Sequence, residues 1–186
     1  MRGLITLFRR RQEGATAVEF ALVAPLFFMV VWGTVEVGML ALASSLMEGA
    51  VREAARVGIT GYSPSGTTRA DHVNNAIKKY TTGFIDFSKL KLDTKAYASF
   101  SVVGQPESYV DANGNGKYDT GETFTDTNNN GKWDSDQGAP GLGAAGEVVS
   151  YTITYEWAWL AGYAKDIFGV PSVTLKSTIT LRNEPF

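Results

Sequence analysis

A run of 22 residues, Ala21 to Leu42, constrains the fold of this chain more than any other feature, because only one charged residue, Glu36, interrupts it. As an α-helix this run would be about 33 Å long, enough to cross a hydrocarbon core of about 30 Å. Three consecutive arginines, Arg9 to Arg11, precede the run, and no comparable basic cluster follows it closely. The positive-inside rule therefore predicts a single-pass membrane helix with a cytoplasmic N-terminus.

The helix is expected to continue beyond the apolar run, because Leu46, Ala50 and Ala54 recur at four-residue spacing. Two other interpretations stay open. One is a secretory signal that is cleaved after Ala43, although its apolar core would be longer than the usual 7–15 residues or so. The other is a simple anchor, in which neither Gly14 nor Glu19 has a role.

The composition narrows the possible functions. The chain has no cysteine, which excludes disulfides and thiolate metal sites, and no basic stripe with interleaved aromatic residues, which argues against nucleic-acid binding. It also has no glycine-rich phosphate loop, no Gly-x-Ser-x-Gly motif and no histidine cluster, since His72 is the only histidine. We therefore expect neither catalysis nor a small-molecule substrate, and we place His72 at a helix surface or edge.

The region after the long helix has the patterns of a small α+β domain. Thr68 is a candidate N-cap for a helix through Tyr80, with Val73, Ile77 and Tyr80 on one face. Alternating apolar and polar residues predict three strands, over residues 92–102, 149–157 and 173–181. The expected fold is an antiparallel sheet with one face covered by helices.

The expected domain organisation has three parts, and their boundaries follow from these patterns. They are a basic leader over residues 1–14, a membrane-spanning helix over residues 15–58, and an α+β domain over residues 59–186. An insertion over residues 104–147, rich in Gly, Asn and Asp, interrupts the third part.

The insertion contains a twelve-residue pattern of oxygen-bearing side chains that is typical of a calcium loop. Calcium is a hard ion that takes six to eight oxygen ligands, and the pattern supplies side chains at positions 1, 3, 5, 9 and 12 with a backbone carbonyl at position 7. In this first loop the candidate ligands are Asp111, Asn113, Asn115, Lys117 through its carbonyl, Asp119 and Glu122, and Gly116 stands at position 6.

A second copy of the loop begins fifteen residues later, with Asp126, Asn128, Asn130, Lys132 through its carbonyl, and Asp134 as candidate ligands. Position 12 of this second loop is Gln137 in place of glutamate. Two alternatives follow: Asp136 supplies the last ligand of the second loop, or Asp126 completes the ligand set of the first loop. We expect one or two Ca²⁺ ions that order the insertion. The competing interpretation is a flexible polar loop built from Asx turns.

The N-terminal residues resemble a known processing motif. The stretch Gly14-Ala-Thr-Ala-Val-Glu19-Phe20 is similar to the cleavage site of type IV pilin-like precursors. The wider run from Arg9 to Leu26 resembles the start of TadE-like pseudopilins, which are minor components of the tight-adherence (Flp) pilus system. The ending Thr180-Leu-Arg-Asn-Glu-Pro-Phe186 resembles the end of that family, whereas the middle of the chain departs from it.

The resemblance implies that a prepilin peptidase cuts between Gly14 and Ala15 and leaves Glu19 as the fifth mature residue, followed by Phe20. Glu19 of one subunit would then pair with the Ala15 amine of its neighbour. The simpler alternative is that Glu19 lies shallow in the membrane and meets water. The implied partners are other pilin-like subunits, the prepilin peptidase and the bacterial inner membrane, with the C-terminal domain in the periplasm or in a surface pilus.

Two functions follow from these observations. The first is a non-enzymatic pseudopilin or minor pilin that acts in pilus assembly, by priming or at the tip. The second is a stand-alone, membrane-anchored, calcium-binding adhesion or sensor domain. Two details stay open: Glu36 either reaches water at the outer interface or contacts a partner helix, and the aromatic segment over residues 157–168 either packs on the core or dips into the membrane.

Overall fold

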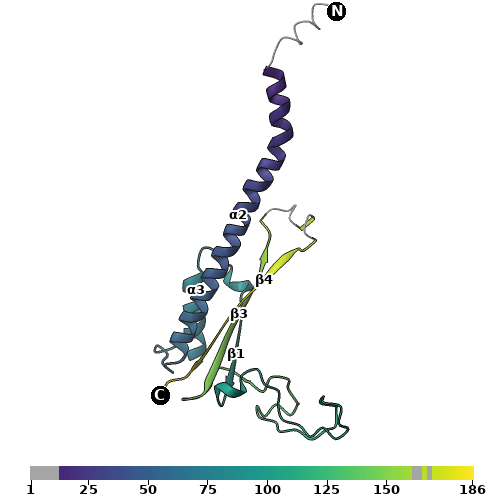
Figure 1. The fold of residues 1–186 in the computed structure, drawn as a ribbon. Helices are drawn as coiled ribbons and strands as arrows, with labels where there is room; N and C mark the ends of the chain where they lie inside the picture. Colours follow the sequence, from purple (N-terminus) through teal and green to yellow (C-terminus); the bar gives the residue numbers. More distant parts are fainter. Residues whose placement is uncertain (1–12, 161–164, 167–168) are drawn as a thin grey trace, which may run out of the picture. The chain divides into compact units, whose positions relative to one another are not determined.

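A computed structural model describes residues 13–160, 165–166 and 169–186 (Figure 1). Most of the predicted leader, and six residues of the aromatic segment over 157–168, lie outside the described residues. The helices and strands are α2 (Glu13–Gly58), α3 (Arg69–Thr81), β1 (Lys91–Tyr97), β2 (Ala139–Pro140), β3 (Val148–Ala158) and β4 (Ser172–Arg182). Two short 3₁₀ helices, η1 (Phe87–Lys89) and η2 (Phe100–Val102), flank β1.

The chain divides into two compact units. One, called here the apolar unit, contains α2 up to Leu42 together with Ala158–Ser172. The other, called the sheet unit, contains Ala43–Trp157 and Val173–Phe186. Helix α2 runs without interruption through the position where a secretory signal would have been cut, and Pro25 lies inside it.

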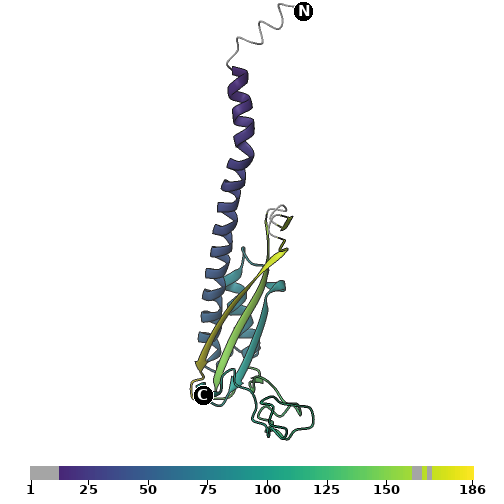
Figure 2. The same ribbon diagram turned by 45° about the vertical axis from the view of Figure 1, so that its right-hand side comes forward.

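The sheet has four strands in the order β2-β1-β3-β4 and is antiparallel, with Lys91 paired to Thr154 and Tyr97 paired to Val148 between β1 and β3 (Figure 2). Strands β3 and β4 confirm two of the three predicted strands. The short β2, which pairs with the end of β1, comes from the insertion and was not predicted. The structure therefore has an apolar helix, a second helix and a small antiparallel sheet, as the α+β prediction required.

The prediction for the remaining strand was wrong at its end, because β1 stops at Tyr97 instead of Val102. Residues Phe100–Val102 form η2, and the hydroxyls of Ser99 and Ser101 lie 2.8 Å apart across it. The amides of Val102 and Val103 donate to the carbonyls of Ser99 and Phe100, so these amides take part in a local turn and not in the sheet ladder. The Phe100 side chain is exposed, with the Arg182 guanidinium 5.7 Å from its ring.

The core of the sheet unit forms where Ala43–Gly58 of α2 and α3 cover one face of the sheet (Figures 1 and 2). Small residues allow close approach: a Cβ on Gly58 would lie 2.1 Å from the Tyr151 hydroxyl, and one on Gly49 would lie 2.3 Å from the Tyr80 ring. The buried apolar side chains include Ala43, Met47, Ala50, Val51, Ala54, Ala55, Val73, Ile77, Val148, Val149, Tyr151 and Ile153.

Helix α3 begins at the predicted cap. The Thr68 hydroxyl accepts from the Asp71 amide, and the Asp71 carboxylate accepts from the Thr68 amide, which together form a capping box. On the predicted face, Val73 and Ile77 are buried, whereas Tyr80 is 49% exposed and its ring lies over Gly49 of α2. His72 lies half-buried at the edge, with Nδ1 3.2 Å from the Tyr62 carbonyl oxygen.

The residues after β4 tie the sheet unit together. The buried Asn183 side chain donates to the carbonyls of Leu142 and Ala144, and the Glu184 amide donates to the Ile59 carbonyl just beyond α2. The Phe186 ring lies over Gly61 and beneath the Arg69 guanidinium, at 5.0 Å. The C-terminal motif that resembled a family ending therefore joins β4 to the residues that follow α2 and to those that precede β3.

In the apolar unit, most of the large apolar side chains of α2 are exposed. Among the described residues, α2 is the helix with the length and composition needed to cross a membrane. The exposed side chains of this stretch include Val18, Phe20, Leu22, Val23, Leu26, Phe27, Phe28, Val30, Val35, Val37 and Leu42.

Candidate functional site

The first acidic loop is curled around the carboxylate of its first residue. Asp111 accepts from the amides of Asn115 and Gly116, at 3.1 and 2.8 Å. Gly114 and Gly116 adopt left-handed backbone angles, with φ of 72° and 75°, which glycine reaches at no steric cost. The glycine at position 6 therefore makes the sharp turn that this loop type requires.

The second loop repeats this geometry, residue for residue. Asp126 accepts from the amides of Asn130 and Gly131, at 3.1 and 2.7 Å. Asn129 takes the left-handed position that Gly114 holds in the first loop, with φ of 58°, a conformation that asparagine tolerates better than most residues. The two sequence copies are therefore two copies in structure.

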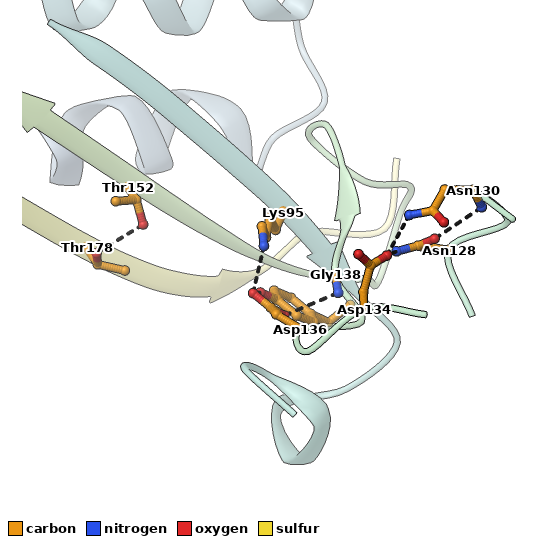
Figure 3. A network of polar contacts seen from close by, with 9 residues as sticks. Lys95, Asn128, Asn130, Asp134, Asp136, Gly138, Thr152 and Thr178 are labelled. Carbon is orange, nitrogen blue, oxygen red and sulfur yellow. Dashed lines mark hydrogen bonds and ion pairs between the residues drawn. The ribbon is translucent and has the colours of Figure 1, made fainter. Parts of the chain in front are cut away.

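In each loop, three oxygen-bearing side chains converge on one point. The amides of Asn113 and Asn115 both donate to Oδ2 of Asp119, at 2.7 and 2.6 Å. Asn128 and Asn130 donate in the same way to Oδ2 of Asp134 (Figure 3). Hydrogen bonds from these two amides lower the pKa of the Asp134 carboxyl below its ordinary value.

The closing carboxylate of the first loop is Glu122, as predicted for position 12. Its two oxygens accept from the amides of Ala112 and Asp119, which are positions 2 and 9 of the loop, both at 2.9 Å. A carboxylate oxygen that accepts one hydrogen bond retains a lone pair for a second partner. Glu122 thus closes the loop and keeps the capacity to bind a cation.

In the second loop, Glu107 occupies the equivalent place. Its oxygens accept from the amides of Thr127 and Asp134, again positions 2 and 9, at 2.7 and 3.0 Å. Glu107 is 1% exposed, and no salt bridge is found for it among the described residues. A buried carboxylate is costly unless it is hydrogen-bonded or paired, and here the two amides supply hydrogen bonds to it.

The two loops exchange their closing residues. Glu122 ends the first loop and lies four residues before the second, whereas Glu107 lies four residues before the first and closes the second. Main-chain bonds show the same exchange, since Val110 donates to Thr123 while Thr125 donates to Ser108. A shift of fifteen residues relates one set of bonds to the other.

An aromatic cluster joins the loops at their eighth positions. Tyr118 and Trp133 stack with ring centroids 4.6 Å apart and an interplanar angle of 11°. Tyr109 and Phe124, which form an antiparallel bridge, pack edge-on against this stack. The loops therefore form one packed pair with a core of its own.

The residues considered for position 12 of the second loop lie elsewhere. The Asp136 carboxylate pairs with Lys95 at 2.8 Å and accepts from the Tyr97 hydroxyl at 3.2 Å (Figure 3). The Asp136 hydrogen bond raises the pKa of Lys95, and burial raises that of Tyr97 to about 12. The Gln137 side chain donates to the Pro106 carbonyl at 3.3 Å, so both residues tie the loops to the chain near β1.

Glu107 was missed from the sequence, although a signal for it was present. The twelve-residue calcium pattern runs from the first aspartate to the twelfth residue and does not include a similarity between the two copies that begins four residues earlier. Aligned from the glutamate, the copies read Glu107-Ser-Tyr-Val-Asp111 and Glu122-Thr-Phe-Thr-Asp126. This longer alignment would have paired Glu107 with Glu122.

The donor set of each loop suits a hard cation. It contains two aspartates, two asparagines, one buried or half-buried glutamate and a backbone carbonyl, all of them oxygen ligands. Within the described residues, no group of three or more His, Cys, Asp or Glu side chains is arranged to hold a metal ion. Amide nitrogens of the asparagines now face the Asp119 and Asp134 carboxylates, so a cation would require those amides to turn their oxygens inward.

The residues predicted for processing lie at the start of α2. Gly14, Ala15, Glu19 and Phe20 are all exposed on this helix. A Cβ at Gly14 would meet no atom within 4 Å, so glycine is not required there for packing within the chain.

Glu36 lies in a setting that differs from one of its two predicted interpretations. It is 4% exposed and so does not reach water. Both of its carboxylate oxygens accept from the Leu160 amide, at 2.9 and 3.2 Å, within the apolar unit. The burial of Glu36 depends on residues distant in sequence, which the local pattern around it could not reveal.

Comparison with known proteins gives one match. The sequence model of a family described as TadE-like protein matches residues 14–56, which begin at Gly14 and include Glu19 and Glu36. The match confirms the resemblance drawn from the N-terminal residues and is consistent with a TadE-like protein of the tight-adherence system. No curated protein and no solved structure matches the chain.

Proposed function

We propose that this protein is a pilin-like subunit of a tight-adherence pilus machine, held in the bacterial inner membrane by α2 until it joins an assembling filament. The observation that carries this proposal is the coincidence of the family match, over residues 14–56, with helix α2, which begins at Glu13 and contains the exposed apolar stretch. Exposed leucine, valine and phenylalanine over this length need lipid or other apolar helices around them. A membrane first, and a filament of neighbouring helices later, would supply both.

The proposed maturation is cleavage by a prepilin peptidase after Gly14. It would free the Ala15 amine, a group with an ordinary pKa of about 7.7–8.0, for pairing with Glu19 of a neighbouring subunit. Such a pair at low dielectric offsets its desolvation only with good geometry, so we assign it a role in register between subunits. The proposed action is in assembly, by priming or at the tip.

The test is the intact mass of the chain isolated from cells that contain a prepilin peptidase. We expect a mature chain that begins at Ala15, and we expect the Gly14→Ala variant to keep its leader. Because a Cβ at Gly14 meets nothing, a loss of cleavage in this variant would report on recognition by the peptidase and not on misfolding. A wild-type chain that keeps Met1, or begins at Ser44, would overturn the proposed processing.

We also propose that the paired loops bind two Ca²⁺ ions, with Glu122 closing one site and Glu107 the other. The shared hydrogen-bond pattern of these two glutamates, together with the burial of Glu107, supports two equivalent sites. When bound, calcium would supply the positive charge that balances each acidic loop. The chain's own residues would set the ligand positions and hold the loops together through the Tyr118–Trp133 stack.

Calorimetric titration of the full chain in detergent tests this assignment. We expect two ions for the wild type, one for Glu107→Gln, one for Glu122→Gln, and two for the control Gln137→Ala. If Gln137→Ala lost an ion while Glu107→Gln kept both, the proposed ligand would be wrong. Protease cleavage between residues 105 and 145 should slow when calcium is added, and equal rates with calcium and with chelator would favour a flexible polar loop.

The second function, a stand-alone adhesion or sensor domain, is separated from the first by its partners. Co-purification with other pilin-like subunits, dependent on Glu19, supports a pilus component. Binding to a cell-surface ligand by a chain whose leader has not been cleaved would support the stand-alone function instead.

A further inference from the structure

The segment that connects β3 to β4 contacts α2 inside the apolar stretch. The described residues of this segment, 158–160, 165–166 and 169–172, are called the hairpin tip, and they belong to the apolar unit together with α2 up to Leu42. Its anchor point is fixed by the Leu160 amide, which donates to both carboxylate oxygens of Glu36 at 2.9 and 3.2 Å. The position of the tip along α2 is therefore the position of Glu36.

That position lies within the stretch expected to occupy the bilayer. Glu36 precedes Leu42, the last residue of the apolar run, by six residues, which corresponds to about 9 Å along a helix. A hydrocarbon core of about 30 Å that starts at Ala21 would end near Leu40, still about 6 Å beyond Glu36. Interfacial segments bury their apolar faces to a depth of about 5–10 Å, so the two lengths agree.

The described side chains of the tip suit the boundary between water and lipid. Leu160 is 51% exposed and Val170 is also exposed, although both are apolar. Trp159 donates its indole N–H to the Val170 carbonyl at 2.8 Å, which satisfies a polar atom that would otherwise be costly in lipid. Tryptophan is enriched at membrane interfaces for this combination of an apolar ring and one polar atom.

The neighbouring surface of α2 continues this apolar character. Val35 and Val37, on either side of Glu36 in sequence, are exposed. Glu36 stands between these two valines in the sequence and accepts a hydrogen bond from the Leu160 amide. Lipid that covers the valines would therefore also reach the hairpin tip. The same contact removes the Glu36 carboxylate from lipid by giving it a backbone donor.

We propose that the hairpin tip dips into the outer boundary of the bilayer that α2 crosses, with Leu160 and Val170 in contact with lipid and with Glu36 as the residue that sets its depth. This inference rests on the proposed membrane insertion of α2. It gives Glu36 a positioning role within a single chain, before any filament forms.

The absence of cysteine from the sequence allows a direct test with single-cysteine variants. Leu160→Cys, Val30→Cys and Val110→Cys are each labelled with bimane in the full chain, in vesicles of phosphatidylethanolamine and phosphatidylglycerol. Val30 reports on the insertion of α2, and Val110, an exposed valine in the sheet unit, is the control for water. Emission is then quenched either by nitroxide lipid or by aqueous iodide.

We expect nitroxide lipid to remove most of the emission at residues 30 and 160 but little at residue 110, and iodide to do the reverse. Lipid quenching at residue 30 with iodide quenching at residue 160 would overturn the hairpin proposal and leave membrane insertion intact. Iodide quenching at both residues would overturn membrane insertion itself. Protection of residue 160 from both quenchers would mean that protein covers the tip, which also overturns the proposal.

A second arm tests the role of Glu36. Glu36→Gln keeps an oxygen that can accept from the Leu160 amide, whereas Glu36→Ala removes it. We expect the label at residue 160 to remain quenched by lipid in Glu36→Gln and to become accessible to iodide in Glu36→Ala, with the label at residue 30 unchanged in both. Identical quenching at residue 160 in the two variants would remove Glu36 from the proposal.

Discussion

The two stretches of α2 belong to one continuous helix but differ in which apolar side chains they expose and which they bury. Up to Leu42 the helix exposes large apolar side chains, and from Ala43 to Gly58 it buries small ones, mostly alanines, against α3 and the sheet. The polar groups differ too, because Arg52 and Arg56 pair with Glu48 and Glu53 on the exposed face of the second stretch. Hydrophobicity alone therefore does not predict burial, since apolar side chains are mostly exposed in one stretch of the helix and buried in the other.

The strongest test of this contrast replaces one methionine in each stretch by alanine. Met47 is 1% exposed and Met29 is 48% exposed. We expect Met47→Ala to lower the free energy of unfolding of the sheet unit by about 2–5 kcal/mol, because it leaves a cavity in the core. Met29→Ala should leave that free energy unchanged. Urea unfolding of the full chain in detergent, followed by near-UV circular dichroism, measures both, and equal losses would contradict the division of α2.

A second pair of substitutions tests the close packing through glycine. Gly58→Ala would place a methyl group against the buried Tyr151 ring, whereas a Cβ at Gly38 meets nothing within 4 Å. We expect Gly58→Ala to destabilise the sheet unit by about 1–3 kcal/mol through overpacking. Gly38→Ala should leave it unchanged or raise helix stability slightly, since alanine has the higher helix propensity. Thermal unfolding of the two variants side by side decides the matter, and an unaffected Gly58→Ala variant would mean that Tyr151 moves aside.

A weaker way to break the same packing is to loosen the partner helix. Thr68→Ala removes the cap of α3, and we expect a loss of about 1 kcal/mol in unfolding free energy. Amide hydrogen exchange should accelerate in α3 and in Ala43–Gly58, but not in α2 before Leu42. Faster exchange over the whole of α2 would show that its two stretches open together.

The smallest effect is expected from the exposed ion pair between Glu53 and Arg56. The hydrogen bond from Arg56 lowers the pKa of the Glu53 carboxyl below its ordinary 4.5. A carboxyl whose pKa is lowered on folding stabilises the fold above its ordinary pKa, and this contribution disappears as the pH falls through the folded value. Glu53→Gln should therefore cost a little stability at neutral pH and none in acid, and should matter less at high salt. A loss that persisted in acid would point to packing in place of charge.

The sequence was sufficient to predict those structures that depend only on residues close together in the chain. The apolar run, the capping residue Thr68 and the alternation over β3 and β4 each describe a local structure, and each prediction for them held. The prediction for the end of β1 failed because the amides of Val102 and Val103 bond to carbonyls three residues earlier instead of to a neighbouring strand. Helical periodicity also showed which residues of α3 share a face, but not that Tyr80 of that face would be exposed while Val73 and Ile77 are buried.

The contacts that the sequence did not reveal join distant segments of the chain. Glu107 lies twenty residues before the Thr127 amide to which it binds, and Glu36 is joined to Leu160 across most of the chain. Pairing of Asp136 with Lys95 is of the same kind, since spacing had suggested a role for Asp136 inside the loop. In each case the residue type was informative, but its partner came from the tertiary fold.

The exchange of closing glutamates between the two loops limits how this region can change in evolution. A tandem repeat is ordinarily free to expand or shrink one copy at a time. Here an in-frame deletion of one fifteen-residue copy would take away a closing residue as well as a loop, because each copy begins with the glutamate that closes the other. The smallest unit that can be gained or lost with its closing residues is thus the pair of loops. We therefore expect relatives of this chain to carry either both copies or neither.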